Sequence, residues 1–335
     1  MLPATRIPHG PFGVVLNANA GRVTPRLAHA VRRVVDPDHV FLTESKEHAE
    51  EVLRACAERE YSAVFAGGGD GTIVDAINTL TRLREEGARV PAIGVLRLGT
   101  GNALAHWLGS GRPVRDLQRY SDRAPHVSRS IRMVTSDGTL FPFGGAGHDA
   151  AVLNDYYAVK SRFKDTALAG LCSGMTGYLI AAFGRTVPAY LSRPNPTVRV
   201  INIGRPAWRV GPGGDETGEA IPTGGVLYEG PAAAVGAATT PQLGYGIRYF
   251  PFACRRPGRF HLRLVNLSPL QCVAAIPAAW RGTLAHPGVH DFYADRVRVT
   301  FSHAMPFQLG GDPAGHRKEV TFGLSQTPVT LIGQA

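Results

Sequence analysis

The run Gly67-Gly68-Gly69-Asp70-Gly71-Thr72 combines residue types that can hold a phosphate group. An apolar run at 63–66 precedes it. Main-chain N–H groups of a glycine turn can surround a phosphate, and a helix that starts there adds partial positive charge. The sequence therefore predicts a strand, a phosphate-binding turn and a helix. The residues after the run have the apolar spacing of the inner face of that helix: Ile73, Ala76, Ile77 and Leu80.

Asp70 restricts the chemistry of this turn, because a carboxylate repels a bare phosphate. We expect a divalent cation, a catalytic water network or an acceptor hydroxyl beside it. The alternative is a glycine turn in which Asp70 only caps the helix. The dinucleotide fingerprint does not fit, since its sixth position is Thr72, and no glycine precedes a lysine as a Walker A loop requires.

Two more glycine-containing runs follow, Leu98–Ala105 (LGTGNALA) and Gly145–Ala150 (GAGHDA). Together with Gly67–Thr72 they resemble, in order, the motifs of the diacylglycerol kinase catalytic-domain family. That family includes bacterial lipid kinases, sphingosine kinases and ceramide kinases. The three motifs span residues 67–150, and weaker matches extend over most of the chain. The resemblance implies two nucleotide loops followed by a segment on the acceptor side.

The resemblance implies ATP as the phosphoryl donor. Asn17 and Gly21 match the family's N-P-x-x-G motif, although Ala18 replaces its proline. Arg22 is expected either to pair with phosphate or to be an ordinary exposed arginine. Thr43 is expected either to contact the nucleotide or to cap the next helix. The full set expected to contact ATP is Asn17, Gly21, Arg22, Thr43, Gly67, Gly68, Gly69, Asp70, Gly71, Thr72, Gly99, Thr100 and Asn102.

The second loop offers polar groups without charge. The Thr100 hydroxyl and the Asn102 amide can donate hydrogen bonds to phosphate oxygens, and the glycines let the main chain approach closely. We therefore predict that this loop contacts the phosphates of a nucleotide that lies at the carboxyl ends of the strands.

A kinase of this kind must also remove the proton of the acceptor hydroxyl, which a nearby carboxylate can do. Asp312 is the predicted base, because Gln308–Asp312 resembles the family's D-G-E stretch with its first Asp replaced by Gly310. Asp70 is the second candidate. Asp149 is expected to hold the acceptor oxygen. The alternative is that Asp312 only shapes a turn.

The resemblance also implies a structural Mg2+ site, at a D-G-x segment before a strand. The corresponding residues here are Arg256-Pro257-Gly258-Arg259, which lack the acidic ligand. We therefore expect Mg2+ to be bound through ATP and not at this protein site. The basic cluster Arg255, Arg256 and Arg259 is either a solvated surface or a contact for acidic lipid.

Strands predicted at 12–16, 40–43, 63–66 and 91–96 alternate with helices, as in a parallel α/β layer whose ligand crevice lies at the carboxyl ends of the strands. Beyond residue 123 the pattern changes to a hairpin at 130–134 and 139–143, and to strands at 197–203, 260–265 and 296–301. We predict an α/β nucleotide-binding domain at 1–123, to which a C-terminal strand at about 324–335 returns. A β-rich, antiparallel, sandwich-like lipid-acceptor domain is predicted at 124–323.

Two segments of the second domain are distinctive. Residues 156–183 are predicted to form a helical insert, which either lines an apolar pocket for the lipid or simply packs in the core. Residues 166–184 carry no charge, and we expect them to be buried or to lie against a membrane instead of crossing it. Residues 204–225, rich in Gly and Pro, are predicted to form a long loop.

The 335 residues, 44% hydrophobic and 19% charged, are typical of a soluble globular protein. The formal charge of +10 favours anionic partners such as nucleotides and acidic membranes, although an arginine-rich genome would produce the same balance. No nucleic-acid-binding pattern is present, so nucleic acid is not an expected partner. The four scattered cysteines are expected to be free thiols in a reducing cytoplasm: Cys56, Cys172, Cys254 and Cys272.

These patterns predict an ATP-dependent lipid kinase, cytoplasmic and peripheral at the inner membrane surface. The acceptor is expected to be the hydroxyl of diacylglycerol, a sphingoid base or ceramide. The family resemblance alone implies diacylglycerol, but the run 101–105 is similar to that of sphingosine kinases, which slightly favours the last two. One alternative is a degenerate family member that binds nucleotide or lipid without catalysis. Another is an NAD kinase, whose family also has the GGDGT turn. A homodimer is left open.

Overall fold

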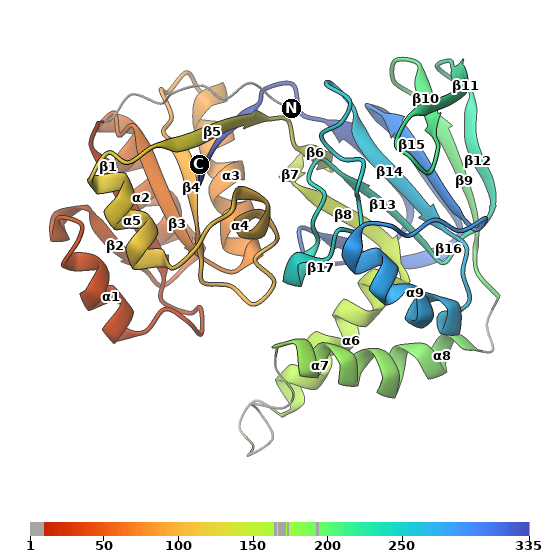
Figure 1. Ribbon diagram of the computed structural model, residues 1–335, viewed down its shortest axis with the longest axis horizontal. Helices are drawn as coiled ribbons and strands as arrows, with labels where there is room; N and C mark the ends of the chain where they lie inside the picture. Colours follow the sequence, from red (N-terminus) through yellow and green to blue (C-terminus); the bar gives the residue numbers. More distant parts are fainter. Residues whose placement is uncertain (1–9, 164–165, 167–171, 173, 192–193, 335) are drawn as a thin grey trace. The chain divides into compact units, whose positions relative to one another are not determined.

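The computed structural model describes residues 10–163, 166, 172, 174–191 and 194–334. The chain divides into two compact units (Figure 1). The first unit contains the described residues up to Met133 and those from Gln326 onward, and the second is Val134–Ser325.

The first unit is built on a six-stranded sheet in the order β2-β1-β3-β4-β18-β5. Neighbouring strands are parallel from β2 to β18, and only the edge strand β5 is antiparallel, to β18. The predicted parallel sheet and the return of the C-terminal strand are therefore seen. The strands are β1 (Phe12–Asn17), β2 (Val40–Thr43), β3 (Ala63–Gly68), β4 (Ala92–Arg97), β5 (His126–Ile131) and β18 (Val329–Gln334).

Helices cover both faces of this sheet. Alternate strand residues point to opposite faces. Val14 packs in one hydrophobic cluster with Val31 of α1 and Leu117 of α5. On the other face a side chain at Gly13 would contact Cys56 of α2, and α2 contacts α3. The helices are α1 (Pro25–Arg32), α2 (Lys46–Glu58), α3 (Asp70–Glu85), α4 (Ala103–Leu108) and α5 (Pro113–Ser121), with a 3-10 turn at Pro37–His39.

The second unit is built on an antiparallel sheet, which among the described residues has twelve strands. Its long strand β16 pairs with β9 through residues 297–301 and with β8 through residues 307–309, so that it joins two parts of the sheet. Among the described residues, six fully buried phenylalanines fill its core: Phe141, Phe250, Phe260, Phe292, Phe307 and Phe322. The strands are β6 (Val134–Ser136), β7 (Thr139–Phe141), β8 (Phe143–Gly147), β9 (Thr197–Asn202), β10 (Ala207–Val210), β11 (Glu216–Ile221), β12 (Val226–Pro231), β13 (Ala234–Ala238), β14 (Phe260–Val265), β15 (Val289–Ala294), β16 (Arg296–Leu309) and β17 (Asp312–Leu324).

Four α-helices accompany this sheet in the described residues: α6 (His148–Arg162), α7 (Gly174–Ala181), α8 (Val187–Leu191) and α9 (Pro269–Arg281). A π-helical turn, Ala182–Thr186, joins α7 to α8, and Gly244–Gly246 is a 3-10 turn. The helical insert predicted at 156–183 thus begins earlier, at His148. Part of the uncharged stretch 166–184 lies outside the described residues. No described helix has the length and apolar character needed to span a bilayer.

The long loop predicted at 204–225 is wrong. The segment contains β10 and β11, which pair with each other, and β10 also pairs with β15. Gly214, with φ of +92°, lies in the connection between them. The glycines mark a turn between two short strands. Because β11 lies at the edge of the sheet and has no buried face, its sequence lacks the alternation of apolar and polar residues that identifies a strand.

The boundary between the two units also lies later in the chain than the predicted domain boundary. Residues 130 and 131 belong to β5, which pairs with β18 in the first unit. The hairpin at Asp137-Gly138 is made by β6 and β7, and both turn residues have positive φ, 48° and 77°. The units therefore divide after Met133, whereas the sequence placed the boundary after residue 123.

Candidate functional site

The Gly67–Thr72 run connects β3 to α3, as predicted. Gly67 and Gly68 end the strand, where a Cβ atom at Gly67 would come within 2.7 Å of the Leu16 side chain and one at Gly68 would overlap Thr72. Gly69 differs, because a Cβ atom there would have no protein atom within 4 Å. The missing side chain at Gly69 therefore leaves open space that packing does not require.

Gly69 is also the N-cap residue of α3 and has no side chain with which to cap this helix. The first N–H groups of an α-helix have no acceptor within the helix. In α3 these belong to Asp70, Gly71 and Thr72. Beside the open space at Gly69, the N-terminus of this 16-residue helix has the geometry that binds phosphate oxygens.

Asp70 connects this turn to the second predicted loop. Its Oδ1 accepts a hydrogen bond of 2.8 Å from the N–H of Ala103, the first residue of α4. A Cβ atom at Gly99 would lie 2.8 Å from the Cα atom of Gly69, so the two loops are packed against each other. Asp70 is the first residue of α3 and not its N-cap, and its carboxylate bonds to the start of α4. The fold thus brings together the first two motifs.

Asn102 fixes the shape of the second loop. It has left-handed backbone angles (φ 54°, ψ 40°) and is buried. Its Oδ1 accepts from Gly99 N at 2.8 Å, and its Nδ2 donates to Gly99 O at 2.6 Å. Thr100 is exposed. A phosphate contact by the Asn102 amide stays a prediction, while its bonds to Gly99 give it a role in holding the loop.

The first turn of the chain reaches the same place through Asn17. Its Nδ2 donates to the Thr72 hydroxyl at 3.0 Å, and its Oδ1 accepts from Asn19 N at 2.9 Å. Gly21 and Arg22 are exposed. Asn17 therefore ties the end of β1 to the first turn of α3.

Thr43 is not the helix cap that one alternative predicted. The N-cap of α2 is Ser45, whose hydroxyl accepts from His48 N at 3.1 Å. Thr43 is buried at the end of β2, and its hydroxyl donates to Leu16 O at 3.4 Å. A contact between Thr43 and nucleotide stays a prediction.

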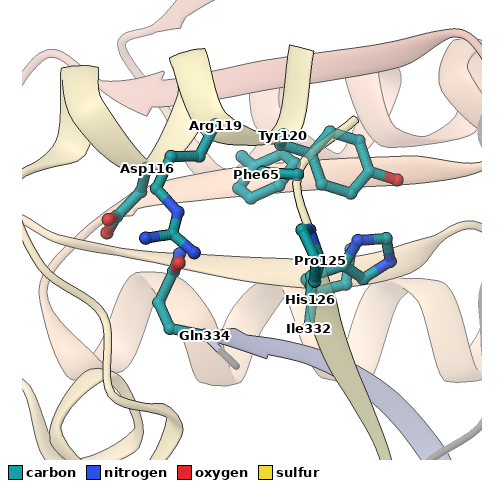
Figure 2. A pocket seen from close by; sticks show the side chains of 9 residues that line it. Phe65, Asp116, Arg119, Tyr120, Pro125, His126, Ile332 and Gln334 are labelled. Carbon is teal, nitrogen blue, oxygen red and sulfur yellow. The ribbon is translucent and has the colours of Figure 1, made fainter. Parts of the chain in front are cut away.

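The first unit also contains a small cavity beneath α5 (Figure 2). Its volume of about 10 Å³ is enough for about one water molecule and far too small for a nucleotide. Asp116 at its edge accepts a hydrogen bond from Gly111 N at 2.7 Å, and burial raises the pKa of its carboxyl. The lining residues are Phe65, Asp116, Arg119, Tyr120, Ala124, Pro125, His126, Ile332 and Gln334.

The third motif lies in the second unit, where Asp149 is the second residue of α6. Gly147 before the helix has φ of +119°, which favours glycine. A Cβ atom at Gly145 would come within 2.7 Å of Val235 O and 3.3 Å of Asp149 Oδ2. The glycines therefore let the helix begin close to β13 and leave room for the carboxylate.

Asp149 carries a perturbed carboxyl group. Burial raises its pKa, and hydrogen bonds from the main chain and from Gln308 oppose that shift. Gln308 Nε2 donates to Asp149 Oδ2 at 3.3 Å. A raised pKa favours the protonated carboxyl, which can both donate and accept a hydrogen bond.

Asp312 is the first residue of β17 and is exposed. Its Oδ1 accepts a hydrogen bond of 3.0 Å from the Tyr157 hydroxyl of α6. Gly310 and Gly311, with positive φ of 59° and 94°, form the turn before it. The turn therefore depends on the two glycines, whereas Asp312 begins the strand.

Gln308 links the two acidic residues of this unit. Besides its bond to Asp149, its Oε1 accepts from Gly311 N at 3.0 Å. The fold thus joins Asp149 to the turn that carries Asp312. The sequence interpretation gave no role to Gln308 or Tyr157, because their partners lie about 150 residues away in the chain. Their nearness to a motif in sequence was the only available signal.

The segment expected to have lost a metal ligand is held by ion pairs. Arg259 Nη1 lies 3.4 Å from Asp295 Oδ2, and Arg256 pairs with Glu216. Arg256 and Arg259 both lie over the Trp208 ring, at 4.5 and 5.4 Å from its centroid. Guanidinium groups do not fit a divalent cation, and among the described residues no cluster of His, Cys, Asp and Glu could hold one.

Comparisons with known proteins agree with these motifs. Residues 11–134 match the model of the diacylglycerol kinase catalytic domain. The chain is 27% identical over 332 residues to a "Probable lipid kinase YegS-like" protein of Klebsiella pneumoniae, covering 96% of this chain and 95% of the relative. It is 24% identical over 311 residues to a diacylglycerol kinase of Bacillus subtilis, covering 90% and 89%. A solved diacylglycerol kinase structure from Bacillus anthracis has the same fold, with a TM-score of 0.63, 15% identity and 97% of both chains covered.

Proposed function

Because this chain belongs to the diacylglycerol kinase catalytic-domain family and is a kinase, we propose that it transfers the γ-phosphoryl group of ATP to a lipid hydroxyl. The observation that carries this proposal is the N-terminus of α3. There, open space at Gly69 meets the N-terminus of a 16-residue helix, with Asp70 beside it. The space and the N–H groups at the start of the helix together leave room for a phosphate group.

The first unit is proposed to hold the donor. The N–H groups of Asp70, Gly71 and Thr72 would bind phosphate oxygens, and the bond from Asn17 would keep Thr72 in place. Mg2+ bound through ATP would neutralise charge on the phosphates. Asp70 is the carboxylate of the loop that would face it, and its bond to Ala103 N fixes its orientation.

The second unit is proposed to hold the acceptor. Asp149, held by Gln308, would hydrogen-bond the lipid hydroxyl. Asp312, held by Tyr157, would take its proton as the oxygen attacks the γ-phosphorus. One O–P bond forms, the bond to the β-phosphate oxygen breaks, and ADP leaves. The predicted second candidate for the base is Asp70.

The names of the relatives support diacylglycerol as the acceptor, whereas the similarity of the run 101–105 to sphingosine kinases slightly favours a sphingoid base or ceramide. The basic charge supports action at an anionic membrane surface, to which the protein would bind peripherally. Both are parts of the proposal.

The experiment incubates purified protein with γ-labelled ATP, Mg2+ and separate pools of diacylglycerol, sphingosine, ceramide and NAD. Label in one lipid supports the proposal and names the acceptor. Label in NAD would replace it with an NAD kinase activity. Nucleotide binding without label in any pool would indicate a degenerate, binding-only protein. Asp70→Asn serves as the control that must lose transfer.

A further inference from the structure

Helix α9 has an unusual surface. Apart from Gln271 and Arg281, all of its 13 residues are apolar, yet only Pro269 and Ala279 are buried. Gln271 is already used, since it completes a capping box with Ser268. A helix that is apolar on all sides normally lies in a protein core or in lipid. The described residues of the second unit leave most of the α9 side chains incompletely covered.

The exposed side chains of α9 are large. Leu270, Ile276 and Trp280 are 63%, 39% and 41% exposed. At 100° per residue, Leu270 and Trp280 lie within one third of the helix circumference, and Arg281 follows on the same side. The outward face therefore combines aliphatic side chains with a tryptophan and a terminal arginine.

A second exposed apolar stripe lies on the neighbouring helical segment. Leu179, Ile180 and Phe183 of α7 and the π-helical turn are 40%, 43% and 48% exposed. This segment continues into α8, which contacts α9. In Figure 1 these helices gather at one end of the second unit. Of the eight large hydrophobic residues that are exposed in the described part of the chain, six belong to these two stripes.

The charges around these stripes are basic. Neither α9 nor residues 174–191 contain Asp or Glu. Arg281 ends α9, and Arg248 N donates to Trp280 O, which places a second exposed arginine beside the tryptophan. On the other segment Arg185 is paired with Asp155 of α6, at 3.2 Å. Lys160 and Arg162 end α6. Arg185, Arg248 and Arg281 thus lie on or beside the apolar stripes, and Arg185 neutralises Asp155.

We propose that Leu270, Ile276 and Trp280 of α9, together with Leu179, Ile180 and Phe183, form a surface that inserts into an anionic lipid bilayer. Apolar side chains would enter the acyl region, tryptophan would lie at the level of the headgroups, and the arginines would meet acidic lipid. This inference rests on the proposed function, because it states how the kinase would reach an acceptor that stays in a membrane.

A second copy of the chain fits this surface less well. The six side chains, about half exposed, present on the order of 500 Å² of apolar area, so the charges around them decide between the two partners. Two copies would also bring their arginines together without carboxylates to neutralise them. An anionic bilayer satisfies both the apolar side chains and the charge.

The test is flotation of the full chain with vesicles of phosphatidylcholine alone, and of phosphatidylcholine and phosphatidylglycerol in equal parts. No ATP and no acceptor lipid are present, so the result does not depend on catalysis. We expect binding to the anionic vesicles, weakened about tenfold by the double substitution Leu270→Ser and Trp280→Ser. Val226→Ser is the matched control, since Val226 is also 41% exposed but lies on β12, and it should bind as the unsubstituted chain does.

A second measurement does not rely on the double variant. Brominated lipids should quench part of the tryptophan fluorescence of the unsubstituted chain, and Trp280→Phe should remove that quenched part. Unquenched fluorescence, or equal vesicle binding by the double variant and the control, would overturn the inference. So would a dimer that the double variant disperses while vesicle binding stays unchanged.

The outcome is separable from that of the proposed function. A chain that phosphorylates a short-chain, water-soluble diacylglycerol but does not bind vesicles would refute the inference alone. A chain that binds vesicles through α9 but phosphorylates no acceptor would refute the kinase proposal alone.

Discussion

Gly69→Ser separates phosphate binding from packing at the N-terminus of α3. The backbone of Gly69 is extended (φ −81°, ψ 175°), which any residue can adopt, and a new side chain would meet no protein atom within 4 Å. Serine is also a preferred N-cap residue. We therefore expect the variant to be as stable as the unsubstituted chain, or more stable by about 0.3 kcal/mol.

The effect on nucleotide binding should be opposite. A serine hydroxyl at this position accepts the N–H of Gly71 or Thr72, which the proposed phosphate would otherwise use, and it fills the open space. A hydrogen bond to a charged group contributes about 1.5 to 3 kcal/mol. Loss of one such bond weakens the affinity for ATP about tenfold to about a hundredfold.

Calorimetric titration with ATP and Mg2+ gives the affinity, and thermal unfolding gives the stability of the same sample. Gly184→Ser is the matched control, because a Cβ atom at Gly184 also has open space and its φ is not positive. We expect this control to bind ATP normally. Unchanged affinity in Gly69→Ser, with unchanged melting temperature, would refute the assignment of phosphate to the α3 N-terminus.

Three further predictions use other contacts. Asp70→Asn keeps an oxygen that can accept from Ala103 N, whereas Asp70→Ala does not. Both variants should abolish transfer of label from ATP, but only the alanine variant should lower the free energy of unfolding in urea, by about 1 to 2 kcal/mol. Transfer by either variant would exclude Asp70 from catalysis. Tyr157→Phe removes the hydrogen bond to Asp312 and should lower kcat about tenfold and shift the pH profile of the rate, with the KM for ATP unchanged; an unchanged kcat would mean that Tyr157 does not position the base. The buried Arg263 guanidinium donates two hydrogen bonds, of 2.7 and 2.9 Å, to the Asp291 carboxylate. Asp291→Asn removes the negative charge that balances this guanidinium and should lower the free energy of unfolding by about 3 to 5 kcal/mol. Burial raises the pKa of Asp291, but hydrogen bonds from His261 and Arg263 outweigh it and hold this pKa at about 2, below the ordinary 3.8. The ionised Asp291 therefore stabilises the fold above pH 4, and this contribution is lost as the pH falls toward 2. An Asp291→Asn variant that unfolds in acid at the same midpoint pH as the unsubstituted chain would contradict this prediction.

The first unit was predictable because local signals agree with its packing. Buried apolar runs mark each parallel strand, and Thr24 followed by Pro25 marks the start of α1, where the Thr24 hydroxyl accepts from Leu27 N. The turn at Gly67–Thr72 is equally local. Short-range patterns determine these elements, so the sequence alone identifies them.

The second unit was less predictable because its pairing is long-range. The edge strand β11 shows no apolar alternation, and β5 is assigned to the first unit only through its pairing with β18. The number of glycines between residues 204 and 225 indicates turns but not whether strands lie between them. Whether strands form there depends on their pairing with strands that are distant in the sequence, and a single sequence does not reveal that pairing.

The site was predictable in its motifs and not in its contacts. Glycine and aspartate spacing is enough to propose Asp70 and Asp149 as candidates. That Asp70 bonds to Ala103, and that Gln308 joins Asp149 to the turn before Asp312, depends on elements that meet only in the folded chain.

The most direct measurement for the central claim is a crystal structure with Mg2+ and a non-hydrolysable ATP analogue. We expect phosphate oxygens about 3 Å from the N–H groups of Asp70, Gly71 and Thr72, with the space at Gly69 filled. A nucleotide bound elsewhere, with that space empty at saturating analogue, would contradict the account.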